Sequence, residues 1–230
     1  MFLDVLGRSP DVTIYNETDP DAFASFRLKP LGQLAPLVES CATPIAAFKS
    51  ICDSQRARWL LDVFPDGRAF WLFRDYRDVV NSSLRLFREH RRYLHYVLHE
   101  PETADWRAEN LSPACLDLIR FHAAREITDA SARALIWYLR NQQYFLNHLD
   151  DEPYTCLVRY EDLVESPSES WRRVCSFLDI PYQERWTATV SARSVGRYEA
   201  PLIDPLIDAL CRDMHERLIA AATAQPSFGF

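Results

Sequence analysis

The sequence predicts an α/β fold in which helices flank a parallel sheet. Short apolar runs typical of buried strands, at 44–48 and 69–73, alternate with helical patterns at 54–64 and 78–92. Such alternation is typical of right-handed crossovers between parallel strands. The chain has 230 residues, enough for one hydrophobic core, so we expect a single domain over residues 1–230.

The first quarter of the chain contains short elements separated by turn residues. The elements expected there are a strand at 12–15, a helix at 31–41 and a small, apolar strand at 44–48. For the helix at 54–64, Asp53 or Ser54 is the expected N-cap, and Pro65 with Gly67 is the expected stop.

The segment "WLFRDYRDVVNSSLR", residues 71–85, changes from a strand pattern to a helix pattern. The strand ends at Arg74, and Asp75 or Asp78 stands where a helix N-cap or first-turn acid belongs. An arginine at the end of a strand, followed by the free backbone N–H groups of a helix, provides the parts of an anion-binding site.

The second half of the chain is mostly helical. Helices are expected at 115–126, 130–149, 166–180 and 201–221, and a buried strand is expected at 154–160. Ser166, Pro167 and Glu169 form a capping-box pattern at the start of one of these helices.

Composition argues against several classes of protein. A net charge of −7 disfavours broad binding to nucleic acid, which requires an excess of basic side chains. No apolar run reaches the roughly 20 residues of a membrane span, and the first residues lack a signal-peptide pattern, so we expect a cytoplasmic protein. The six cysteines are scattered without metal-ligand spacing, which predicts reduced thiols and no metal site.

Cationic and hydroxyl side chains follow the predicted parallel strands. Lys49 follows one strand, Arg74 and Ser82 follow the next, and Tyr160 follows a third. Because ligands bind outside the carboxyl ends of such strands, these side chains predict a phosphate site. The structural alternative is that Arg74 only forms an ion pair with Asp78 or Asp75 and that Ser82 is a small residue at a helix contact.

Two segments together resemble the PAPS-dependent sulfotransferase family: "FWLFRDYRDVVNSSLR" (70–85) and "LVRYEDLVESPSESWRRVCSFLDIP" (157–181). The donor in this family is 3′-phosphoadenosine 5′-phosphosulfate (PAPS). The resemblance implies that Arg74 and Ser82, eight positions apart, bind the donor's 3′-phosphate, and that Tyr160 lies near its adenosine.

A later segment, "ARSVGRYEAPL" (192–202), is similar to the family's loop over the 3′-phosphate. The resemblance assigns Arg193 and Arg197 to the phosphate and Gly196 to a hinge.

The resemblance also implies a P-loop-like parallel sheet, but this sequence lacks the family's usual first strand and its loop of the type P-x-S/T-G-T/S-T. None of the five glycines lies in such a loop. Two interpretations stay open: a truncated gene model, or a relative that has lost the chemistry.

The implied activity is transfer of a sulfuryl group from PAPS to a hydroxyl or amine of a small acceptor, without a metal. Glu17 is the candidate base, because Ile51 stands where many relatives have histidine. Lys49 is the candidate group that stabilises the leaving phosphate. The alternatives are a degenerate module that binds a 3′-phosphoadenosine nucleotide without catalysis, a P-loop nucleotide kinase relative, and a purely structural interaction protein.

The acceptor and the oligomeric state stay open. Loops at 92–112 and 182–200 are the expected specificity elements, because binding groups concentrate on loops.

Overall fold

The computed structural model describes residues 1–87, 90–99, 106 and 109–225. These residues form two compact units, one from residues 1–56 and 166–190 and the other from residues 57–165 and 191–225. The expectation of a single domain over residues 1–230 stays a prediction. The fold is α/β, mostly helical with short parallel sheets, which confirms the predicted class.

The first unit contains one parallel strand pair and one β-hairpin. Its elements are α1 (Phe2–Leu6), β1 (Val12–Tyr15), β2 (Phe23–Ala24), β3 (Arg27–Leu28), α2 (Leu31–Glu39), β4 (Ile45–Phe48), the 3-10 helix η1 (Ile51–Arg56), α9 (Pro167–Leu178) and the 3-10 helix η3 (Glu184–Trp186). β1 pairs with β4 in parallel, with Tyr15 opposite Phe48 at the carboxyl end. Trp171 of α9 is fully buried and packs on Phe2, at 5.1 Å between ring centroids.

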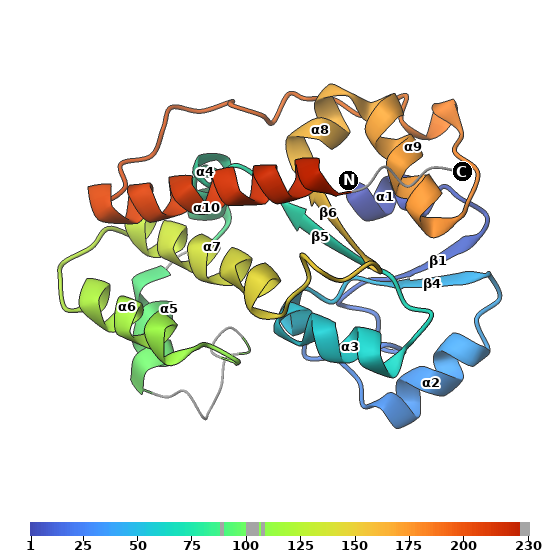
Figure 1. Ribbon diagram of the computed structural model, residues 1–230, viewed down its shortest axis with the longest axis horizontal. Helices are drawn as coiled ribbons and strands as arrows, with labels where there is room; N and C mark the ends of the chain where they lie inside the picture. Colours follow the sequence, from blue (N-terminus) through green and yellow to red (C-terminus); the bar gives the residue numbers. More distant parts are fainter. Residues whose placement is uncertain (88–89, 100–105, 107–108, 226–230) are drawn as a thin grey trace. The chain divides into compact units, whose positions relative to one another are not determined.

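The second unit contains the other parallel pair and the long helices. Its elements are α3 (Ala57–Val63), β5 (Ala69–Phe73), α4 (Tyr76–Leu86), α5 (His90–His99), α6 (Pro113–Ala123), α7 (Asp129–Leu146), β6 (Thr155–Arg159), α8 (Tyr160–Glu165) and α10 (Pro205–Ala224). Figure 1 shows β5 and β6 side by side, with α8 following β6. Helix α7 packs against α4 and α10, and Leu135, Tyr144 and Leu157 are buried in the core.

Asp53 and Ser166 do not form the side-chain caps predicted for them. Asp53 is not an N-cap, since its carboxylate accepts hydrogen bonds from Arg27 Nε and Leu28 N, each at 2.8 Å, and residues 51–56 form a 3-10 helix before α3. Ser166 makes no side-chain cap within the described residues, although Pro167 does begin α9 as predicted.

Two other helices have boundaries that differ from the predicted ones. The helix expected at 78–92 begins at Tyr76 and ends at Leu86, and a separate helix begins at His90, while residues 88–89 lie outside the described part. The helix expected at 201–221 begins at Pro205, because the Asp204 carboxylate accepts hydrogen bonds from the backbone of its first turn.

Candidate anion-binding site

The turn between β5 and α4 is fixed from both sides. Asp75 is the N-cap of α4, and its Oδ1 accepts hydrogen bonds from the backbone of Arg77 at 2.8 Å and Asp78 at 3.4 Å. Asp75 N in turn donates to Glu161 Oε1 at 3.0 Å. The helix N–H groups that the sequence suggested as free for an anion are therefore partly used by Asp75.

Arg74 lies at the carboxyl end of β5, as predicted. Its Nη2 donates to Asp78 Oδ2 at 2.9 Å and to the backbone carbonyl of Ser194, and its guanidinium lies 4.7 Å from the centre of the Tyr160 ring. The ion pair with Asp78, which was the structural alternative, is therefore present. Arg74 Nε is buried and has no hydrogen-bond partner among the described residues.

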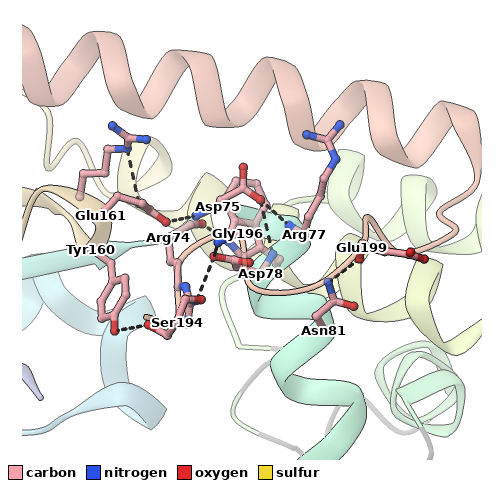
Figure 2. A network of polar contacts seen from close by, with 12 residues as sticks. Arg74, Asp75, Arg77, Asp78, Asn81, Tyr160, Glu161, Ser194, Gly196 and Glu199 are labelled. Carbon is pink, nitrogen blue, oxygen red and sulfur yellow. Dashed lines mark hydrogen bonds and ion pairs between the residues drawn. The ribbon is translucent and has the colours of Figure 1, made fainter. Parts of the chain in front are cut away.

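Residues 191–199, called the strap below, run along α4 in the same unit. Gly196 N donates to Asp78 Oδ2 at 3.1 Å, and Asn81 Nδ2 donates to the carbonyl of Glu199 at 3.0 Å (Figure 2). Tyr160 Oη and Ser194 Oγ lie 3.0 Å apart. The strap is thus held by the β5–α4 turn, by α4 and by the first residue of α8.

The predicted strap residues have unequal surroundings. Gly196 adopts a φ of +57°, the left-handed conformation that favours glycine. Arg193 and Arg197 are exposed, and the Arg197 guanidinium lies 5.2 Å from the centre of the Tyr198 ring. The structure therefore brings the strap backbone to Arg74 and leaves both strap arginines at the surface.

Ser82 lies in α4 one turn after Asp78 and is half-buried. The four-residue spacing places it on the same face of α4 as Asp78.

Glu17 and Lys49 lie together in the first unit. Lys49 N donates to Tyr15 O at 2.9 Å, which extends the β1–β4 pairing by one residue, and Lys49 Nζ lies 3.2 Å from Glu17 Oε1. Their side chains are 38% and 26% exposed, so this ion pair is open to solvent and ligands. Parallel pairing of β1 and β4 accounts for their meeting at one sheet edge.

Buried titratable groups surround the β5–α4 turn, and sequence reasoning gave them no role. Burial raises the pKa of Glu161, although the hydrogen bond from Asp75 N opposes the shift. Burial likewise lowers the pKa of His215, whose Nδ1 lies 3.8 Å from Asp75 Oδ2. Glu161 directly follows Tyr160 in the "RYEDL" segment, and this position in the sequence could have indicated that it lies near the site.

No cluster of three or more potential metal ligands occurs in the part of the chain that the structure describes. In the same part, none of the helices is both long and apolar enough to cross a membrane.

The chemistry of three residues of the second unit is compatible with an oxyanion such as a phosphate group. Arg74 provides a guanidinium whose buried Nε–H lacks an acceptor among the described residues, and Ser82 provides a hydroxyl. An aromatic ring, Tyr160, lies against the guanidinium.

A model described as the sulfotransferase family matches residues 13–184, three quarters of the chain. The chain belongs to the sulfotransferase family. A solved structure, a sulfotransferase from Alicyclobacillus acidocaldarius, is 16% identical with a TM-score of 0.52, over 98% of this chain and 92% of that one. At this identity the likeness shows the fold alone, and no curated protein matched.

Proposed function

We propose that this protein transfers a sulfuryl group from PAPS to a hydroxyl or amine of a small acceptor. The observation that carries the proposal is Arg74, which directly follows β5, with Nη2 hydrogen-bonded to Asp78 and with a buried Nε–H that lacks an acceptor among the described residues. Family membership supports a transferase and PAPS as the donor. A small-molecule acceptor and a cytoplasmic location stay predictions.

In the proposed donor site, Arg74 and Ser82 bind the 3′-phosphate, and the ring of Tyr160 lies near the adenosine. Arg193 and Arg197 add positive charge from the strap, with Gly196 allowing its backbone to bend. Charge-assisted hydrogen bonds to an oxyanion are the strongest contacts such a site offers. Binding therefore depends first on Arg74.

In the proposed reaction, the acceptor oxygen or nitrogen attacks sulfur, and the bond from sulfur to the bridging phosphate oxygen breaks. Glu17 takes the acceptor's proton, and Lys49 stabilises the negative charge that develops on the leaving phosphate. The products are the sulfated acceptor and 3′-phosphoadenosine 5′-phosphate. In support of this assignment, Lys49 Nζ lies 3.2 Å from Glu17 Oε1.

The test is a calorimetric titration with 3′-phosphoadenosine 5′-phosphate, with adenosine 5′-monophosphate as the control ligand. We expect saturable heat with the bisphosphate alone. Arg74→Ala should weaken binding about tenfold to a hundredfold, because it removes hydrogen bonds to a charged group. Ser82→Ala should weaken binding less, and Arg212→Ala, at an exposed arginine of α10, should leave it unchanged. Equal affinity for the two nucleotides would refute the 3′-phosphate site.

The degenerate module is separated from the enzyme by incubation with PAPS and a mixture of phenolic, alcoholic and amine acceptors. Acceptor-dependent release of 3′-phosphoadenosine 5′-phosphate, abolished in Glu17→Gln, supports catalysis. Binding without release would leave a nucleotide-binding module. The nucleotide kinase alternative has no support in the family match.

A further inference from the structure

Contacts from the β5–α4 turn and one face of α4 hold the strap along its length. Its polar contacts, seen in Figure 2, are Arg74 Nη2 to the Ser194 carbonyl, Gly196 N to Asp78 Oδ2, and Asn81 Nδ2 to the Glu199 carbonyl. Further along the helix, the Arg85 guanidinium lies over the Tyr198 ring. Asp78, Asn81 and Arg85 are spaced at three- and four-residue steps in α4, so they share one helix face, and Arg74 lies in the turn before that helix.

Asp78 joins two of these contacts through a single atom. Its Oδ2 accepts from Arg74 Nη2 at 2.9 Å and from Gly196 N at 3.1 Å, while its side chain is 8% exposed. A buried carboxylate is stable only when donors compensate its lost hydration. The Asp78 carboxylate therefore connects Arg74 with the strap through hydrogen bonds. Because the carboxylate is buried, it needs these donors to replace its lost hydration.

This arrangement decides which donors of Arg74 face a ligand. Both hydrogen bonds that Arg74 donates to the described residues use Nη2. A ligand would therefore meet the Nε–H or the Nη1 group, which point to different edges of the guanidinium and donate singly, from an arginine held in one orientation.

We propose that Asp78 is a positioning residue for the donor nucleotide: it orients the Arg74 guanidinium and docks the strap that carries Arg193 and Arg197. The proposal rests on the proposed function, because it takes the 3′-phosphate as the ligand of Arg74. Asp78 acts through Arg74 and the strap. The alternative role predicts the opposite change in affinity, because a carboxylate that only faced the phosphate would repel it and weaken binding.

These two roles predict opposite changes in affinity for 3′-phosphoadenosine 5′-phosphate. Asp78→Ala should raise the Kd about tenfold or more, as loss of a charge-assisted hydrogen bond does. Asp78→Asn should raise it less, because the amide oxygen can take the place of Oδ2 and accept from both donors, so that only the negative charge is lost. The matched control is Asp213→Asn, the same charge change at an exposed site on α10. Unchanged or tighter binding in both Asp78 variants would overturn the proposal.

A second measurement needs no nucleotide. Trypsin cleaves after arginine, and the strap carries two exposed arginines, so cleavage after Arg193 and Arg197 reports whether the strap is docked. We expect faster cleavage at both bonds in Asp78→Asn and Asp78→Ala than in wild type or Asp213→Asn. Cleavage at the wild-type rate would overturn the docking role.

The two measurements separate the proposals. If wild type fails to bind the bisphosphate, the proposed function fails, and faster strap cleavage then supports only the docking part. If wild type turns over PAPS, Asp78→Asn should raise the KM for PAPS and keep kcat at saturation, which a general loss of folded protein would not do. Where Asp78→Ala does not fold, Asp78→Asn carries the test.

Discussion

Replacing Glu161 with alanine should destabilise the second unit through the β5–α4 turn. Glu161 is 2% exposed, and its Oε1 accepts the hydrogen bond of Asp75 N at 3.0 Å. Without that acceptor, a backbone N–H is left unsatisfied, which costs about 1–3 kcal/mol. The second interaction, 3.4 Å from Oε2 to Arg159 Nε, adds less than about 1 kcal/mol, because the Arg159 side chain is 32% exposed and also pairs with Asp162.

Glutamine at position 161 separates the two contributions. It keeps a carbonyl oxygen for Asp75 N and removes only the charge beside Arg159. We therefore expect Glu161→Gln to cost about 1 kcal/mol or less and Glu161→Ala about 2–4 kcal/mol.

Urea unfolding at pH 7.5, followed by tryptophan fluorescence, measures both variants against wild type, with the slope m checked for constancy. Because the turn also carries Arg74, Glu161→Ala should weaken binding of 3′-phosphoadenosine 5′-phosphate as well. Equal destabilisation by alanine and glutamine would refute the hydrogen bond to Asp75 N as the main contribution. So would an alanine variant as stable as wild type.

Two other predictions concern stability. Because burial raises the pKa of Glu161, the folded protein binds its proton at a higher pH than the unfolded chain, whose value is near 4.5. Wild type should therefore gain stability relative to Glu161→Gln as the pH falls through the folded pKa toward 4.5. Urea unfolding at pH 8 and pH 5 measures the difference. If wild type instead gained stability relative to the variant at the higher pH, the result would contradict this prediction. In the first unit, Asp53→Asn should cost about 2–3 kcal/mol, because one of its two donors, Arg27 Nε or Leu28 N, then faces an amide NH2 group. Asp62→Asn, at a 59% exposed side chain, is the control and should cost less than about 1 kcal/mol in the same assay; equal losses would contradict the role of Asp53.

Local sequence signals were sufficient for most elements of the fold. Apolar runs located β4, β5 and β6, and Asp75 was among the predicted caps of α4. Asp53 shows where such signals fail, because a carboxylate suited to an N-cap instead binds a hairpin some 25 residues away in sequence. A local pattern states what a side chain can do and leaves open which partner it finds in three dimensions.

The same limit applies to the candidate site. The strand pattern placed Arg74 at the end of β5, and the resemblance placed Tyr160 near the same ligand. In the structure the Arg74 guanidinium lies 4.7 Å from the centre of the Tyr160 ring. The strap contacts could not be predicted, because they use the backbone atoms Ser194 O, Gly196 N and Glu199 O. Backbone donors and acceptors are present at nearly every residue and leave no mark on the sequence.

The sequence of α4 alone does not show which of its polar residues are buried. A helix with polar residues at three- and four-residue steps is ordinarily read as facing solvent. Asp78 is only 7% exposed, however, so this part of the face is covered by protein and its carboxylate must be compensated. The strap that covers it lies beyond residue 184, where the family match ends. The contacts of the strap are therefore evidence that does not depend on the family match. If undocking the strap weakens nucleotide binding, the donor site must include residues beyond the matched segment.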